Sequence, residues 1–394
     1  MGAVGLVLTG GGARAAYQIG ALEALARLVP GRTPFRILSG VSAGAINAAF
    51  LATQADDFRG AVERLKKTWV SLRPGRIYRT DARRLMAIGS RWMRDLSSGG
   101  LVGRGPINFL LDASPLRDML SAEVPMARIR ELIEKQVLRG VAVTATSYQT
   151  SVAVTFFDGH PEVEPWVRST RLGVRETLRL DHVLASAALP IFFPPIRMRG
   201  AFYGDGCVRM TAPLSPAIHL GAERVVAVSV RHWRSPEELM PGRSRRDNLA
   251  PSEIAGALVN PGFLDAVEAD VERLERLNRL IQLVPNRARS ELPHPIRPVE
   301  ALVLRPSKDL GRLAEDEYQR FPRFLRCGPR KSVNRTSSFS LPTTTPATCS
   351  APTATAWPRP RTWTGWPRRA RGSRRPNLRS RSRCPRTRRS SRGS

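Results

Sequence analysis

The sequence predicts an α/β fold in which helices cover a central, mostly parallel sheet. The prediction rests on two successive strand–loop–helix units at the start of the chain and on later apolar runs of strand length. Each unit has an apolar run, a glycine-containing loop and a stretch with apolar residues at helical spacing: residues 3–9, 10–12 and 15–28, then residues 35–38, 40–44 and 45–53. Strands joined through helices run parallel, so the two units predict two parallel strands in one sheet.

The rest of the chain adds a helical segment and more strands. Residues 56–134 have a mainly helical pattern, and we expect them to form a cap over one end of the sheet. Residues 253–284 predict a long helix whose apolar face is formed by Leu274, Leu277 and Ile281. Strands are expected in three further stretches: residues 140–157, 224–230 and 299–304.

Charge divides the chain into a body and a tail. The formal net charge is +30, and residues 327–394 contain 17 Lys and Arg without a single acid. We predict one globular domain over residues 1–326 and a basic, disordered tail rich in Arg, Ser and Pro over residues 327–394. The tail is either a selected basic segment or the product of a shifted reading frame. We favour the frameshift, because a shifted GC-rich frame yields an acid-free composition more readily than selection does.

The body shows no signal for export or for membrane insertion. It has no apolar run of 18 or more residues, and Cys207 is its only cysteine, so we expect a cytoplasmic protein. Residues 80–96 place Ile88 and Trp92 on a helical face opposite several arginines. This amphipathic stretch is either a cap helix packed on the sheet or a peripheral contact with an anionic membrane.

The second loop carries a candidate nucleophile. GVSAG at residues 40–44 matches the G-x-S-x-G pattern of a nucleophile elbow, in which a strand precedes the turn and a helix follows it. Gly40 and Gly44 fit because a Cβ at either position would collide with backbone in so sharp a turn. Ser42 is then expected to be exposed at a helix N-terminus, where the dipole and free amides favour the developing alkoxide.

The first loop, TGGGARAAYQIG at residues 9–20, allows two interpretations. Gly10, Gly12 and Ala15 satisfy the G-x-G-x-x-G/A fingerprint of dinucleotide-binding folds, which also requires an acid at the end of the next strand. The next strand instead runs into the GVSAG turn. In a serine hydrolase, the glycine loop would aim backbone amides at one point and form an oxyanion hole, with Arg14 supporting the loop or meeting a lipid phosphate.

A third candidate is Asp205, which lies between Gly204 and Gly206 in the stretch YGDGCVRMTAPL. Glycine on both sides suits a carboxylate presented on a tight loop, although Asp-Gly turns are also common without any function.

Together, these three elements resemble the patatin-like phospholipase family, whose motifs are G-G-G-x-R, G-x-S-x-G and a distant D-G-G/A. The resemblance extends over residues 3–326 and includes the surroundings of the aspartate at 186–206 and 212–230. It implies a patatin-like three-layer α/β/α fold with a helical cap. Cys207 and Ala15 depart from the pattern, because the family usually has Gly or Ala at the first position and often Gly at the second.

The resemblance also implies an activity. The protein would be a serine lipid acyl hydrolase of the phospholipase A, lysophospholipase or esterase type, acting on lipid or phospholipid esters without a metal or cofactor. The implied roles are nucleophile for Ser42, acid/base for Asp205, oxyanion hole for Gly10, Gly11, Gly12 and Arg14, nucleophile elbow for Gly40 and Gly44, and motif glycine for Gly206.

Three other interpretations stay open. A Ser-Asp-His triad would use one of the five histidines, which are His160, His182, His219, His232 and His294, although none lies in a recognisable motif. The chain could instead be an NAD(P)-binding protein of the Rossmann type, or a catalytically silent binding module whose tail contacts nucleic acid. The presence of both Ser42 and Asp205 argues against a silent module, so we do not expect a nucleic-acid partner.

Overall fold

The computed structural model describes residues 2–29, 33–79, 90, 109, 111–233, 266–290 and 297–320. The chain divides into two compact units, Met1–Pro352 and Thr353–Ser394, and every described residue belongs to the first. The tail from residue 327, the stretch 80–96 apart from Ser90, and His294 lie outside the described residues. The expectations made for them, and for a domain boundary at residue 326, stay predictions.

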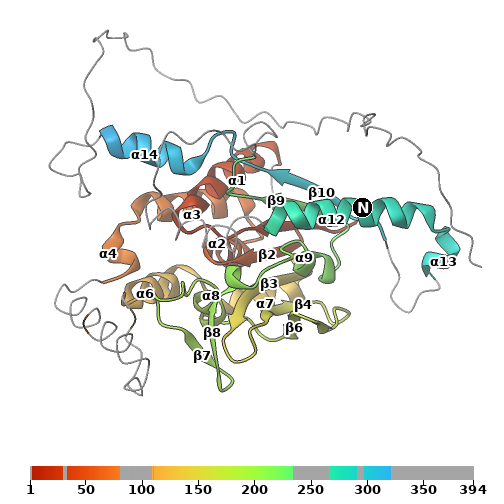
Figure 1. Ribbon diagram of the computed structural model, residues 1–394, viewed down its shortest axis with the longest axis horizontal. Coiled ribbons are helices and arrows are strands. Elements are labelled where there is room, and N and C mark those ends of the chain that lie inside the picture. The colour runs from red at the N-terminus through yellow and green to blue at the C-terminus, as the bar shows by residue number, and fades with distance from the viewer. Residues whose placement is uncertain are drawn as a thin grey trace, which may run out of the picture. The chain divides into compact units, whose positions relative to one another are not determined.

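A ten-stranded sheet forms the centre of the first unit (Figure 1). Its main path runs in the order β10-β9-β1-β2-β3-β4-β6-β5, while β8 pairs with β3 and β7 pairs with β8. The strands are β1 (Val4–Leu8), β2 (Ile37–Val41), β3 (Gly140–Ser147), β4 (Ala153–Gly159), β5 (Trp166–Arg168), β6 (Arg171–Arg175), β7 (Ile196–Met198), β8 (Ala201–Asp205), β9 (Arg224–Val228) and β10 (Glu300–Leu304). The strands expected from the sequence are all present.

The two predicted strand–loop–helix units lie in the parallel part of the sheet. β1 pairs in parallel with both β2 and β9, so that Leu8 lies opposite Gly40 on one side and Val228 on the other. The loops after β1 and β2 therefore leave the sheet at the same edge, where open α/β sheets bind their ligands. β3 pairs in parallel with β2 but antiparallel with β4 and β8, which makes the sheet mixed.

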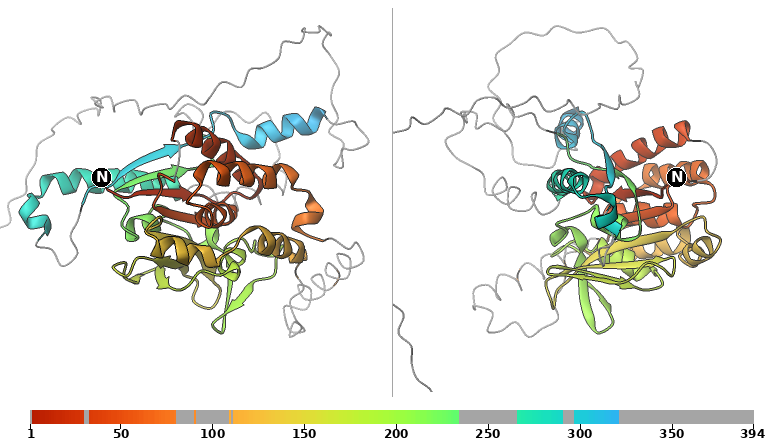
Figure 2. Two further views of the ribbon diagram at one scale, coloured as in Figure 1. Left: turned by 180° about the vertical axis from the view of Figure 1, so that it is seen from behind. Right: turned by 90° about the vertical axis from the view of Figure 1, so that its right-hand side faces the viewer.

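Helices cover both faces of the sheet (Figure 2). One apolar core joins α1, α2, α3, α6, α7 and α8 to one face, and a second core joins α9 and α12 to the other. The alternation of β1 separates them, because Leu6 and Leu8 belong to the first core and Val7 to the second. The predicted α/β/α layering is thus present.

The helices and short 3-10 turns of the described residues are η1 (Gly12–Ala15), α1 (Ala16–Leu28), α2 (Ala43–Ala52), α3 (Phe58–Ser71), α4 (Pro74–Ile77), α6 (Ser114–Glu123), α7 (Ala127–Glu134), α8 (Leu180–Ser186), η2 (Gly206–Val208), α9 (Ser215–His219), α12 (Ala266–Leu283), α13 (Asn286–Ser290) and α14 (Leu310–Arg320). Four of them, α3, α4, α6 and α7, lie within the stretch 56–134 that was predicted to be mainly helical.

The predicted face of the long C-terminal helix is wrong in part. Leu274 of α12 packs against the second core as expected, but Leu277 is 48% exposed. The inward side carries polar groups that an apolar pattern does not reveal. Asp270 is buried and accepts a hydrogen bond from the Leu214 amide, and the Asn278 side chain bonds the backbone of Val299.

Among the described residues, no helix is both long enough and apolar enough to cross a membrane.

Candidate active site

Ser42 lies in a strained turn between β2 and α2. Its backbone has φ 55° and ψ −129°, a conformation that residues with a Cβ rarely adopt. A Cβ on Gly40 would lie 2.4 Å from the Gly44 carbonyl oxygen, and a Cβ on Gly44 would lie 2.2 Å from the Leu8 carbonyl oxygen. Both atoms are backbone and have no room to move, so the turn requires glycine at both positions.

Ser42 is buried and not exposed as the sequence suggested. Only 3% of the residue is accessible, although it does precede the first turn of α2. The glycine loop after β1 covers it: a Cβ on Gly10 would lie 3.1 Å from the Ser42 Cβ. The sequence places Ser42 at a helix end but carries no signal for the loop that passes over it.

Two long-range contacts hold the backbone of the turn. The Ser42 amide donates to the hydroxyl of Ser186 at 2.9 Å, and that hydroxyl donates to the Thr144 carbonyl oxygen at 2.6 Å. Ser186 is fully buried at the end of α8, and Thr144 lies in β3. The position of Ser42 therefore depends on three separate elements.

Asp205 is the last residue of β8 and is fixed through its own backbone. Its amide donates to the Ala188 carbonyl oxygen at 2.8 Å, and its carbonyl oxygen accepts from the Thr146 hydroxyl at 2.8 Å. A Cβ on Gly206 would lie 2.1 Å from the Thr144 carbonyl oxygen, so the chain can turn away after Asp205 only with glycine there.

The structure brings Ser42 and Asp205 together although 163 positions separate them in the chain. The Ser42 hydroxyl donates to Oδ2 of Asp205 at 2.6 Å, and Asp205 is completely buried. The other carboxylate oxygen, Oδ1, accepts from the Cys207 amide at 2.9 Å. Both carboxylate oxygens thus have donors, and neither of these donors carries a charge.

Burial raises the pKa of Asp205 from its usual value to about 6. The hydrogen bonds from Ser42 and Cys207 act in the opposite direction, since they stabilise the carboxylate, but desolvation is the larger effect. A carboxylate with this pKa is ionised near neutral pH and is more basic than an ordinary aspartate.

The glycine loop that follows β1 lies beside Ser42. Gly11 and Gly12 have positive φ values of 153° and 55°, and η1 begins at Gly12. The Arg14 amide donates to the Gly11 carbonyl oxygen at 3.1 Å, so this amide closes the turn. The Arg14 guanidinium lies near Gly311 of α14.

The amides of Gly11 and Gly12 donate no hydrogen bond to another described residue. Unpaired amides of this kind occur at helix starts and can donate hydrogen bonds to an anionic oxygen.

A chain of buried amides anchors the base of this loop. The Gln18 side chain donates to the Thr9 carbonyl oxygen at 2.7 Å, and the Asn47 side chain donates to Gln18 at 2.8 Å. Trp69 of α3 completes the chain with a 2.8 Å bond to Asn47. Because Asn47 lies on α2, the network ties the glycine loop to the helix that follows Ser42.

The described histidines have partners away from the pair. His182 is buried and packs on Phe156, and its Nδ1 accepts a hydrogen bond from the Arg179 amide. His219 stacks on Trp166, and His232 bonds the Pro306 carbonyl oxygen. Within the described part of the chain, no histidine hydrogen-bonds to Ser42 or Asp205.

Sequence reasoning missed the residues that hold the pair in place, namely Ser186, Thr146, Gln18 and Asn47. None lies in a recognisable pattern, because each acts through a contact with a distant segment. Ser186 is the first residue of the stretch 186–206, which resembles the family's surroundings of the aspartate, but the resemblance gives this serine no role.

Comparison with known proteins is consistent with these motifs. The patatin-like phospholipase family matches residues 6–218, which is more than half of the chain and contains both Ser42 and Asp205. No curated protein sequence matches the chain. Among solved structures, VipD from Legionella pneumophila is 15% identical with a TM-score of 0.35, over 78% of this chain and 62% of that one.

The ExoU–SpcU complex from Pseudomonas aeruginosa is 17% identical with a TM-score of 0.26, over 69% of this chain and 52% of that one. The chain thus spans less than two thirds of either structure. The extent of the family match, together with the motifs it contains, shows that the chain belongs to the patatin-like phospholipase family.

Proposed function

We propose that the protein is a lipid acyl hydrolase in which Ser42 is the nucleophile and Asp205 is the general base. The observation that carries the proposal is the 2.6 Å hydrogen bond from the Ser42 hydroxyl to a fully buried carboxylate. A hydroxyl is a weak nucleophile until a base takes its proton, and the contact lies within the range needed for that transfer.

The reaction runs in two halves. Asp205 takes the Ser42 proton as Oγ attacks the ester carbonyl carbon, and the amides of Gly11 and Gly12 stabilise the oxyanion. The alcohol leaves with the proton from Asp205, which leaves the acyl group on Ser42. Water then gives a proton to Asp205 and attacks the acyl carbonyl. The fatty acid departs, and the proton returns to Ser42.

The raised pKa of Asp205 supports its role as a base. An aspartate with an ordinary pKa would be too weak to accept a serine proton efficiently, whereas a pKa of about 6 increases its basicity while leaving it ionised at pH 7. The substrate class, an ester of lipid or phospholipid, follows from membership of the family and is part of the proposal.

Hydrolysis of p-nitrophenyl butyrate and of a phosphatidylcholine by the full chain tests the proposal. Ser42→Ala should abolish both reactions. Ser39→Ala is the matched control, because Ser39 is also buried and lies three residues earlier, on β2. Ser39→Ala should retain activity within a few-fold. Equal activity in wild type and Ser42→Ala would overturn the assignment, and a thermal shift with NAD or NADP would favour the dinucleotide alternative.

A further inference from the structure

Five large apolar residues are exposed on segments next to the turn that carries Asp205. They are Tyr148 (43% exposed), Ile191 (49%), Phe192 (49%), Phe202 (42%) and Val208 (38%), and together they are called the apolar face. A single exposed apolar side chain is common on soluble proteins, but a group of them beside one site is typical of an interaction surface.

Two of the segments that carry the apolar face are joined to Asp205. Tyr148 follows β3, and it covers Gly204, because a Cβ on Gly204 would lie 2.2 Å from the Tyr148 hydroxyl oxygen. Residues 189–204 form a loop whose two ends meet where the Asp205 amide donates to the Ala188 carbonyl oxygen. A ligand bound to either segment therefore lies close to the candidate base.

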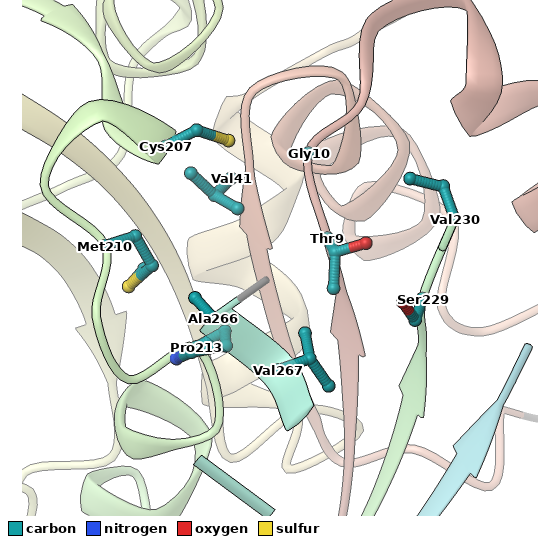
Figure 3. Close-up of a pocket in the computed structure, with 10 residues that line it drawn as sticks. All are labelled: Thr9, Gly10, Val41, Cys207, Met210, Pro213, Ser229, Val230, Ala266 and Val267. Carbon is teal, nitrogen blue, oxygen red and sulfur yellow. The ribbon is translucent and has the colours of Figure 1, made fainter. Parts of the chain in front are cut away.

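The third segment turns Val208 outward because its neighbours pack inward. Cys207 and Met210 are buried in one cluster with Val41, and Figure 3 shows the Cys207 side chain pointing toward Val41. Val208 and Arg209 lie between these two buried residues and are exposed. The buried cluster thus holds this part of the apolar face at the surface.

The loop of residues 189–204 is held in an outward conformation. Ile191 has φ 74°, which is unfavourable for a β-branched residue, and the Phe193 amide closes the turn by donating to the Leu189 carbonyl oxygen at 2.9 Å. Phe202 belongs to the hairpin of β7 and β8, which projects from the sheet in Figures 1 and 2. The fold therefore exposes these side chains against local preference.

The charges around the apolar face are positive. Residues 189–211 contain three arginines and one acid, the buried candidate base. One of the arginines, Arg199, lies 3.1 Å from Glu176. The other two, Arg197 and Arg209, are exposed and form no ion pair with any residue that the structure describes.

Arg197 and Arg209 contact neutral groups. The guanidinium of Arg197 lies 5.9 Å from the centre of the Phe202 ring, and Arg209 donates to the Ser151 carbonyl oxygen at 2.6 Å. Exposed aromatic rings beside arginines fit the interfacial layer of an anionic bilayer, where the rings lie at the acyl boundary and the guanidinium groups meet phosphates. A bilayer requires no complementary shape, which suits side chains on a projecting hairpin.

On the basis of the proposed function, we propose that the apolar face binds an anionic lipid bilayer and brings Ser42 and Asp205 to the lipid esters within it. The aromatic and aliphatic side chains of the face enter the layer between head groups and acyl chains, while the two exposed arginines bind lipid phosphates. This surface is separate from residues 80–96, whose amphipathic pattern also allowed a membrane contact.

Vesicle binding by the full chain tests the proposal, with Ser42→Ala as the background so that binding is measured without hydrolysis. Vesicles of phosphatidylcholine, alone or with phosphatidylglycerol, are sedimented to obtain partition coefficients. Phe192→Ser and Phe202→Ser should each weaken binding to both kinds about tenfold, because the exposed part of an aromatic side chain then leaves the apolar layer. Arg197→Gln should weaken binding about fivefold, and only with phosphatidylglycerol.

Leu28→Ser and Arg27→Gln are the matched controls. Leu28 is 77% exposed and ends α1, a helix that leads away from the glycine loop, and Arg27 is exposed beside it. Neither control should change binding by more than a few-fold. Residues 327–394 are present in every variant, so the attraction of this basic segment to anionic vesicles cancels.

A second measurement separates docking from catalysis. With Ser42 intact, Phe192→Ser should slow hydrolysis of phosphatidylglycerol in vesicles about tenfold, while kcat/KM for soluble p-nitrophenyl butyrate changes by less than a few-fold. Equal losses with both substrates, unchanged vesicle binding, or an equal effect of Leu28→Ser would overturn the inference.

Two further outcomes distinguish the inference from the proposed function. Self-association in solution that disappears in Phe192→Ser would assign the apolar face to a second copy of this chain and would overturn the inference alone. Vesicle binding through the face, with no ester hydrolysed by the wild type, would refute the proposed function and leave the docking surface in place.

Discussion

Asp205 and Asp158 are two buried carboxylates in the same sheet, and they differ in the charge of the groups that surround them. Asp205 is 0% and Asp158 1% exposed, and burial raises the pKa of both. The donors around Asp205 are neutral: the Ser42 hydroxyl, the Cys207 amide and the Cys207 thiol. Asp158, in β4, faces the guanidinium of Arg130 at 3.1 Å. Asp205 thus has a hydrogen-bond partner, the Ser42 hydroxyl, whose proton it can accept, whereas Asp158 has a positively charged counter-ion.

The difference shows how similar burial can serve two purposes. A cation beside a carboxylate stabilises its charge and makes it a poorer base, as Arg130 and Arg175 do at Asp158. Neutral donors hold a carboxylate in place with less effect on its basicity. The surroundings of Asp205 therefore suit proton transfer, whereas those of Asp158 suit a structural ion pair.

The largest effect is expected from exchanging each aspartate for asparagine. Asp205→Asn removes the base while keeping the shape of the side chain, and we expect kcat for p-nitrophenyl butyrate to fall by about 10⁴-fold, as for other serine hydrolases that lose a member of the catalytic unit. Asp158→Asn should change kcat by less than a few-fold. Comparable losses in both variants would mean that Asp205 acts only through the fold.

The pH dependence should separate activity from stability at the same residue. Asp205 must be ionised to act as a base, so kcat/KM should rise with pH through about 6 and then level off. Stability should change in the opposite direction. The folded-state pKa lies above the unfolded value of 3.8, so the folded protein binds the proton more tightly. The contribution of Asp205 to the free energy of unfolding is therefore complete well below pH 3.8 and is lost as the pH rises through about 6.

The difference between 3.8 and about 6 corresponds to about 2 kcal/mol of unfolding free energy lost between pH 4 and pH 7, because the carboxyl of the unfolded chain is already partly ionised at pH 4. Urea denaturation of wild type and Asp205→Asn at both pH values measures it by difference, which cancels the contribution of Asp158. An Asp205→Asn variant with the same pH dependence as wild type would contradict the assigned shift.

The counter-ion of Asp158 should matter for stability alone. Arg130→Met leaves a buried carboxylate with a weakened electrostatic partner, and we expect a loss of about 2 kcal/mol, reduced by the partial exposure of Arg130 and by the charge of Arg175. Arg128→Met is the control on the same helix, because its ion pair with Asp56 is exposed on both sides and should contribute less than about 1 kcal/mol. Thermal denaturation with matched kcat measurements distinguishes the two.

How far the sequence predicted this site depends on the range of the contacts involved. The turn at Ser42 could be predicted because its requirements are local: Gly40 and Gly44 are needed by backbone within a few residues or on the adjoining strand. The parallel sheet followed from the two adjacent strand–loop–helix units for the same reason. The position of Asp205 was indicated only by its flanking glycines and by the family resemblance.

Contacts between distant segments could not be predicted. Ser186 hydrogen-bonds to Ser42, 144 positions away, and Thr146 hydrogen-bonds to Asp205, 59 positions away. The sequence around Ser186 and Thr146 has no pattern that indicates these contacts. The exposed Leu277 has a related cause, because Asp270 and Asn278 take inward positions only where the backbone of Leu214 and Val299 meets them. The burial of Ser42 depends in the same way on where the glycine loop folds back.

The smallest effect is expected at Ser186, which holds Ser42 without touching substrate. Ser186→Ala leaves the Ser42 amide and the Thr144 carbonyl oxygen unpaired, so the strained turn can relax, and we expect kcat to fall about tenfold with little change in KM. Ser147→Ala is the control, because Ser147 is also buried but its hydroxyl accepts only a long 3.4 Å bond from Thr150. Equal losses of activity in both variants, or a change in KM and not in kcat for Ser186→Ala, would contradict the prediction. The strained backbone of Ser42 would then be maintained by Gly40 and Gly44 without the contact to Ser186.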